Sequence, residues 1–118
     1  DEFIKRNGIE KYTANELNSD LDRILNNINL KNKNIHLSFD IDSLDPQISP
    51  GTGLRVPNGI KVDTAKRIMK YLIHNNNIVA FDFVEYNPRY DKDDVSLNII
   101  CDLILFCMEE YLERQFNF

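Results

Sequence analysis

The stretch HLSFDIDSLDPQISPGTG, residues 36–53, places carboxylates at the end of an apolar strand. The apolar positions Ile35, Leu37, Phe39 and Ile41 alternate with the polar positions His36, Ser38, Asp40 and Asp42. This period of two is that of a β-strand, in which alternate residues share one face. In an extended strand Asp40 and Asp42 would lie about 6.6 Å apart. Two carboxylates so placed repel each other unless a cation lies between them, which favours a metal site.

The rest of the chain predicts helices that alternate with strands. Helices are predicted over about 14–29, 61–74 and 94–113, and strands from residue 35 to the Asp45-Pro46 break and over 78–84. Thr13 and Glu16 have the spacing of a capping box at the start of the first helix. The run IVAFDFV, residues 78–84, is nearly all apolar, which is typical of a strand buried on both faces. This order predicts the α/β class, with a parallel sheet between two layers of helices.

The predicted sheet is small for the chain that carries it. Two strands cannot close both edges of a sheet or shield an apolar strand. We therefore expect residues 1–118 to be the C-terminal portion of a single larger domain, with the other strands supplied upstream. The opening DEFIKRNGIEKY has no initiating Met, which fits a chain that starts inside a structure.

Composition narrows the class of partner. The chain is 42% hydrophobic, which is enough for a core and excludes a disordered tail. Its formal net charge of −5 argues against nucleic acid or an anionic membrane as a partner. No apolar run has the length of a membrane span. Cys101 and Cys107 are expected to be buried, reduced thiols, which points to a cytoplasmic compartment.

The acidic residues fall where α/β sheets bind ligands. Ligands bind beyond the carboxyl ends of parallel strands, where Asp40 and Asp42 follow one predicted strand and Glu85 follows the other. Hard oxygen ligands favour Mg²⁺, Ca²⁺ or Mn²⁺, and one carboxylate pair could serve two ions. The alternative is a pair of solvated loop acids, one of which caps a helix.

Two other D-x-D sites fit the sequence less well. An EF-hand loop starting at Asp40 needs Gly at its sixth position and Glu at its twelfth, where this chain has Asp45 and Gly51. A phosphatase of the haloacid dehalogenase type usually has Thr where this chain has Leu44. Its second acidic pair would have to be Asp93-Asp94, several residues past the end of the second strand.

Two longer motifs resemble the ureohydrolase family, and within it the arginases. SFDIDSLDPQISPGTG, residues 38–53, matches the family stretch S-x-D-x-D-x-x-D-P-x-x-x-P-G/A-x-G. DFVEYNP, residues 82–88, matches a later strand that ends in D-x-x-E-x-x-P. The motifs occur in the family's order, and with the flanking helices the resemblance covers nearly the whole chain.

The resemblance implies a three-layer α/β/α fold and a site that holds two Mn²⁺ ions. Asp40 matches a ligand that bridges both ions, Asp42 a ligand of one ion, and Glu85 the acid that receives the substrate guanidinium. The implied reaction is hydrolysis of L-arginine to L-ornithine and urea by a metal-activated hydroxide, with no further catalytic side chain. A homotrimer or hexamer is also implied.

The motifs point to more than one substrate and supply only part of the site. Glu85-Tyr86-Asn87-Pro88 is more like arginases, whereas Pro50-Gly51-Thr52-Gly53 is common among agmatinases, so agmatine or another guanidino substrate is the alternative. The family's D-x-H-x-D ligands are missing from residues 1–118, so we expect the chain alone to be inactive. A different class of function is a non-catalytic assembly module that uses the last helix as an interface.

Other polar residues near the motifs read as structural. His36 lies about 13 Å down the strand from Asp40, too far to share an ion with it. Ser38 is expected to hydrogen-bond Asp40, and Asp82 to make a buried structural hydrogen bond. Asp45 is expected to fix the turn that follows the strand.

Overall fold

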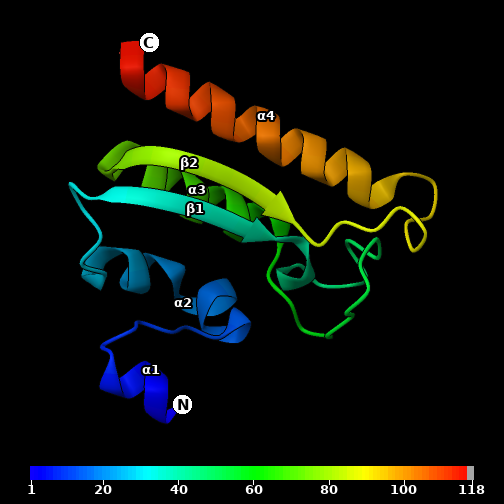
Figure 1. Ribbon diagram of the computed structural model, residues 1–118, viewed down its shortest axis with the longest axis horizontal. Coiled ribbons are helices and arrows are strands. Elements are labelled where there is room, and N and C mark those ends of the chain that lie inside the picture. Colours follow the sequence, from blue (N-terminus) through cyan, green and yellow to red (C-terminus); the bar gives the residue numbers. More distant parts are fainter. Residues whose placement is uncertain (117–118) are drawn as a thin grey trace.

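Two parallel strands form the sheet of the computed structural model, which describes residues 1–116 (Figure 1). The strands are β1 (Asn34–Asp40) and β2 (Asn77–Val84), and the helices are α1 (Glu2–Arg6), α2 (Ala14–Asn27), α3 (Val62–Asn75) and α4 (Val95–Phe116). A 3₁₀ turn, η1 (Ile41–Ser43), follows β1. Within this part of the chain, none of the helices combines the length and apolar character needed to cross a membrane.

The order of elements confirms the predicted α/β class. Each predicted helix and strand is present, with ends that shift by a few residues, and only α1 and η1 were not foreseen. The capping box is present: the Thr13 side chain accepts from the backbone N–H of Glu16, and the Glu16 carboxylate accepts from the N–H of Thr13 at 2.7 Å. These bonds pair backbone donors that a helix start leaves free, so α2 begins at Ala14.

Alternation along β1 sets the core face of the sheet. Leu37 and Phe39 pair in register with Phe81 and Phe83 of β2, and the rings of Phe39 and Phe83 lie 5.8 Å apart. These side chains join one hydrophobic core with the buried face of α3. The strands therefore present their apolar residues to α3, which lies behind them in Figure 1.

The helices complete the core through a stripe on α3. Ala65, Met69 and Ile73 recur every four residues and are buried, as one face of a helix requires. Leu103 and Cys107 of α4 are buried in the same core, and the Cys107 sulfur lies 3.4 Å from the sulfur of Met69. α2 and α4 thus pack on α3, to either side of it in Figure 1.

The other face of the sheet is open within residues 1–116. Val79 of β2 is 63% exposed, and Ala80 and Val84 are exposed as well, so β2 is not buried on both faces here as its apolar run predicted. Cys101 is also exposed, which corrects the expectation that both thiols are buried.

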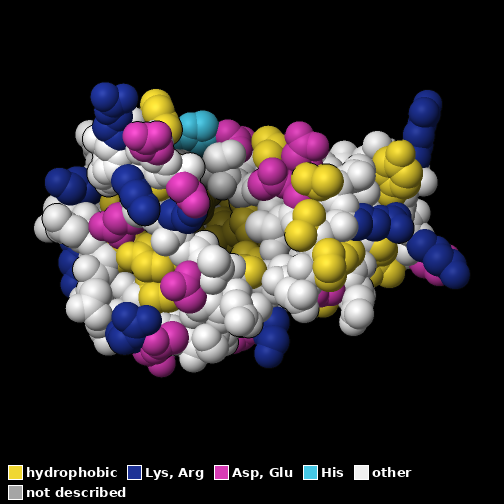
Figure 2. Space-filling model, turned by 90° about the horizontal axis from the view of Figure 1, so that it is seen from below, with side chains coloured by type: hydrophobic (Ala, Val, Ile, Leu, Met, Phe, Trp, Pro, Cys, Tyr) yellow, Lys and Arg dark blue, Asp and Glu magenta, His cyan; other side chains and the backbone are white. Residues whose placement is uncertain are grey.

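On the face shown in Figure 2, acidic and basic side chains are interspersed, and neither sign of charge dominates that face.

Candidate metal and substrate site

Asp40, Asp42 and Glu85 gather at one end of the sheet. Asp40 is the last residue of β1 and pairs in register with Val84, the last residue of β2. Glu85 follows Val84 directly, and Asp42 follows Asp40 within η1. The parallel pairing therefore brings the three acids predicted from sequence to the carboxyl ends of both strands, which lie side by side in Figure 1.

Asp42 does not continue the strand, contrary to the extended spacing predicted from sequence. The side chain of Asp40 accepts a hydrogen bond from the backbone N–H of Asp42 at 2.8 Å, and Ser43 Oγ donates to the carbonyl of Asp40 at 2.7 Å. An aspartate that binds a backbone N–H two residues on competes with the strand ladder. The chain therefore turns at Asp40, and Asp42 lies in the η1 turn instead of on the strand.

The electrostatics of Asp42 are those of a carboxylate that lacks a counter-ion. Burial and the negative charges of Asp40 and Glu85 raise the pKa of Asp42 above its ordinary value. Its Oδ1 atom is buried and has no hydrogen-bond partner among the described residues. A buried acceptor without a donor costs free energy that a bound cation would recover. The donors present are carboxylate oxygens, which suit a hard divalent cation.

Glu85 has a backbone conformation that is uncommon for its residue type. Its φ is 69°, in the left-handed region, where a side chain other than glycine costs about 1 kcal/mol or more. The left-handed step turns the chain out of β2 and re-aims the Glu85 side chain, which is exposed. Strain of this kind is found at functional sites, where the surrounding structure holds it in place.

The loop after η1 returns to the site and braces it. Leu44 and Ile60 form a parallel bridge, and the Asp45 carboxylate accepts from the N–H groups of Gln47 at 2.9 Å and Gly59 at 3.2 Å. These bonds confirm that Asp45 fixes the turn. A Cβ atom on Gly59 would lie 2.5 Å from the backbone of Leu44, so only glycine permits this approach.

A hollow of about 300 Å³ opens beside Asp42. Its walls come from the start of α2 and from the returning loop, and include Tyr12, Leu17, Val56 and Ile60. The walls are mostly apolar, with Asp42 as the acidic group. Binding pockets commonly combine apolar walls with few polar groups that fix orientation.

Asp82 ties the two strands together just before the acids. Its carboxylate accepts from Ser38 Oγ and contacts His36 Nε2, and the Ser38 bond chiefly lowers the pKa of Asp82. His36 thus has a structural partner. Ser38 donates its hydrogen bond to Asp82, whereas the sequence analysis predicted a bond to Asp40. The Asp82 side chain is 40% exposed, so its predicted burial is not found within residues 1–116.

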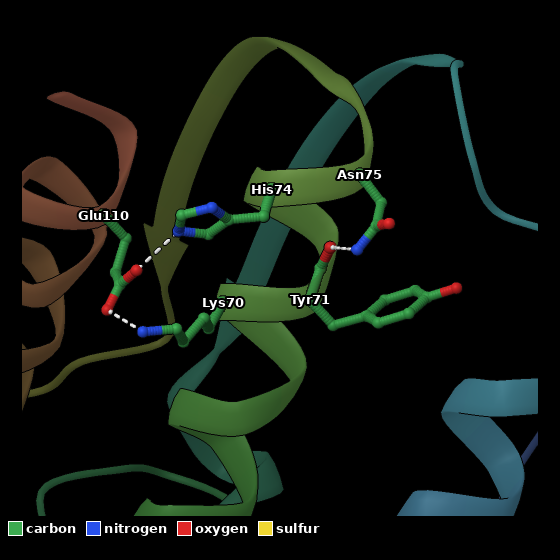
Figure 3. Close-up of polar contacts among 5 residues, drawn as sticks. All are labelled: Lys70, Tyr71, His74, Asn75 and Glu110. Atoms are coloured by element: carbon green, nitrogen blue, oxygen red, sulfur yellow. Dashed lines mark hydrogen bonds and ion pairs between the residues drawn. The ribbon is translucent and has the colours of Figure 1, made fainter. Parts of the chain in front are cut away.

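A second group of metal-ligand side chains lies elsewhere. His74, Glu110 and Glu113 bring ligand atoms within 4.8 Å of one another, and no other trio of such side chains in residues 1–116 does so. In Figure 3 the Glu110 carboxylate already accepts from Lys70 Nζ at 3.0 Å and pairs with His74 Nε2 at 2.6 Å. The motifs did not point to this group. Its signal was the spacing of Glu110 from Leu103 and Cys107, which places it on the buried face of α4.

The sequence is similar to that of proteins of known family. Residues 1–108 match the Arginase family. An agmatinase of Cronobacter sakazakii is 38% identical over 101 residues, covering 80% of this chain and 32% of the relative. A hepatic arginase of Aquarana catesbeiana is 32% identical over 119 residues, covering 89% and 36%. The chain thus spans about a third of the length of these relatives.

The solved structures agree with the sequence comparison. The arginase of Bacillus caldovelox superposes with a TM-score of 0.73 at 27% identity, covering 94% of this chain and 37% of that protein. The parallel strands and their helices are therefore those of the arginase-like α/β fold. Because the family match spans most of the chain and the fold agrees, this protein belongs to the arginase family.

Proposed function

We propose that this chain supplies the metal-binding and guanidinium-binding strand ends of an enzyme that hydrolyses a guanidino substrate to urea and an amine. The observation that carries the proposal is the meeting of Asp40, Asp42 and Glu85 at the carboxyl ends of two paired strands. Membership of the arginase family supports this reaction class. The sequence spans about a third of its relatives, so the activity is proposed for the whole protein, of which residues 1–118 would be the C-terminal portion.

The two aspartates would hold the metal. Asp42 Oδ1 is buried and unpaired, and Asp40 uses one oxygen on the η1 turn, which leaves its other oxygen for a cation. Asp40 and Asp42 would contribute oxygen ligands to two ions of Mn²⁺, a hard cation that suits carboxylate donors. When bound, such a metal pair supplies a water of lowered pKa as the nucleophile. The remaining ligands would come from other parts of the protein, so residues 1–118 alone would be inactive.

Glu85 would bind and orient the substrate. A guanidinium group is planar and pairs with a carboxylate through two parallel hydrogen bonds. Glu85 lies close enough to Asp42 for their charges to interact. A substrate guanidinium bound to Glu85 would therefore have its central carbon near the proposed metal-binding acids. The Glu85 carboxylate would thereby hold that carbon in position for attack.

Two guanidino compounds are candidates for the substrate. L-Arginine, which would yield L-ornithine, is favoured by Glu85-Tyr86-Asn87-Pro88. Agmatine, which lacks the α-carboxylate, is favoured by Pro50-Gly51-Thr52-Gly53 and by the several relatives named agmatinase. We place L-arginine first on the residues that follow Glu85 and keep agmatine as the direct alternative.

The deciding experiment measures urea release by the whole protein loaded with Mn²⁺, with arginine and agmatine in parallel. We expect release from one substrate, and its loss in Asp40→Asn with the fold retained by circular dichroism. Asp102→Asn, an exposed position on α4, is the matched control and should leave the rate unchanged. Absence of release from any guanidino compound would overturn the proposal and favour an assembly module.

The assembly alternative has one observation in its favour. α4 carries an outward stripe of exposed apolar side chains that includes Leu105, Met108 and Leu112. Such a stripe is typical of a helix face that packs against another protein surface. Loss of oligomers in Leu105→Ser/Met108→Ser, with no hydrolysis by the parent protein, would support that function. A homotrimer or hexamer is equally compatible with the enzyme.

A further inference from the structure

We propose that Asp91 is a positioning residue that holds Glu85 ready to bind the substrate guanidinium. Asp91 acts through Tyr86, the residue next to Glu85, and through the first turn of α4. The inference rests on the proposed function, because it assigns Asp91 a part in substrate binding at the same site. It concerns a residue outside the two motifs that led to that function.

Glu85 requires external support. Its left-handed φ of 69° is disfavoured for a residue with a side chain, so free chains leave this conformation readily. No side-chain hydrogen bond or ion pair holds Glu85 itself among residues 1–116. The conformation must therefore be fixed by the residues that follow it, of which Tyr86 is partly buried against the core.

Asp91 collects three hydrogen bonds at this point. The Tyr86 hydroxyl donates to Asp91 Oδ2 at 3.2 Å, and the backbone N–H groups of Ser96 and Leu97 donate to its two oxygens at 2.9 Å each. Burial raises the pKa of Asp91, but these bonds outweigh burial and leave the pKa below its ordinary value. Asp91 thus stays ionised while it joins Tyr86 to the start of α4.

The same contact reaches the loop that follows β1. The N–H of Gly51 donates to Ser96 Oγ at 2.7 Å, and the N–H of Asn87 donates to the carbonyl of Gly51 at 2.8 Å. A Cβ atom on Gly51 would lie 2.7 Å from Cβ of Ser96, so the two segments touch as closely as glycine allows. The segment after Glu85 is therefore held between α4 and the loop after Asp42. We call the contacts of Asp91, Ser96 and Gly51 with this segment and with each other the clamp.

This arrangement should act on substrate binding more than on the chemical step. The clamp touches Tyr86 and Asn87, which flank Glu85 on its C-terminal side, and makes no hydrogen bond to Asp40 or Asp42. Loosening it would let Glu85 leave the conformation that receives the guanidinium, while the metal-binding acids keep their turn. If only a fraction of the protein can bind substrate, the apparent dissociation constant is the intrinsic constant divided by that fraction.

The test compares two hydroxyl deletions in the whole protein with Mn²⁺. Tyr86→Phe removes the bond to Asp91 and keeps the ring in the core. Tyr90→Phe is the matched control, because the Tyr90 hydroxyl forms no hydrogen bond with the described residues. We expect Tyr86→Phe to raise KM about tenfold, as loss of one hydrogen bond to a charged group would, with kcat changed less than about threefold. Tyr90→Phe should match the wild type.

A second variant separates positioning from general loosening. Asp91→Asn keeps the shape but weakens all three accepted bonds, and the double variant with Tyr86→Phe should have the KM of Asp91→Asn alone, because both act through one contact. Additive KM effects, an unchanged KM, or a fall in kcat and melting temperature with KM constant would overturn the positioning role. A wild-type protein that hydrolyses no guanidino compound would instead overturn the proposed function, and the inference with it.

Discussion

At the two ends of the sheet, the pKa values of carboxyl groups shift in opposite directions. At the carboxyl ends of the strands, burial and the negative charges of Asp40 and Glu85 raise the pKa of Asp42. Near the amino end of β2, Glu110 is only 8% exposed, yet Lys70 and His74 both bind its carboxylate. Burial raises the pKa of Glu110, but its bonds to those two residues outweigh burial and lower it.

The difference is the one expected between the proposed binding site and a structural contact. Glu110 of α4 is neutralised by side chains of α3, so its charge is satisfied inside the folded chain and joins two helices (Figure 3). Asp42 Oδ1 is buried without a hydrogen-bond partner among the described residues, which costs stability and would favour the binding of a cation, as we propose. Sites that bind ligands commonly keep such unfavourable arrangements, which other parts of the fold offset.

The largest effect is expected from Asp42→Asn in the whole protein. Loss of a ligand charge should lower the rate of urea release about a thousandfold or more, because the metal site no longer forms. The metal-free variant should be more stable than the metal-free wild type, because burial and the charges of Asp40 and Glu85 disfavour ionised Asp42. Urea assays and chemical denaturation without metal measure the two effects.

Protection by Mn²⁺ tells the two ends of the sheet apart. Added Mn²⁺ should raise the melting temperature of the wild type and of Glu110→Gln, but not of Asp42→Asn, since only the latter loses a proposed ligand. The reverse pattern would place the ion on His74, Glu110 and Glu113 and contradict our assignment.

An intermediate effect is expected from Glu110→Gln, at about 2 kcal/mol of lost stability near neutral pH. The pKa of Glu110 is lowered from its ordinary value of 4.5, so ionised Glu110 stabilises the fold fully when the pH is above 4.5. This stabilisation is lost as the pH falls through the pKa of Glu110 in the folded protein. The free energy gap between wild type and variant should therefore close in acid. Glu109→Gln, an exposed neighbour, should show no gap at any pH.

The smallest effect is expected from Lys70→Met. The Lys70 side chain is 55% exposed, so water screens its ion pair and its removal should cost less than about 1 kcal/mol. Lys31→Met, at an exposed position, serves as the control, and the melting temperatures of the two variants should nearly coincide. A loss as large as that of Glu110→Gln would mean that Lys70, and not His74, supplies most of the support for Glu110.

Local patterns predicted much of this fold and placed the candidate acids. The alternation in β1, the capping box at Thr13 and the four-residue apolar spacing in α3 each reflect contacts within a few residues, which sequence can report. The end of β1 was misread, because alternation alone cannot show that Asp40 captures the N–H of Asp42. The bond of Ser38 to Asp82 was missed because it depends on the register of two strands.

The sequence by itself determined the order of helices and strands, the acidic residues at the strand ends and their resemblance to the ureohydrolases. Only the tertiary structure decided the turn at Asp42, the left-handed Glu85 and the clamp that Asp91 closes between α4 and two loops. The physical reason is distance along the chain. Periodicity, caps and motifs are local, whereas Gly51 and Ser96 meet across 45 residues, in a contact that packing alone creates.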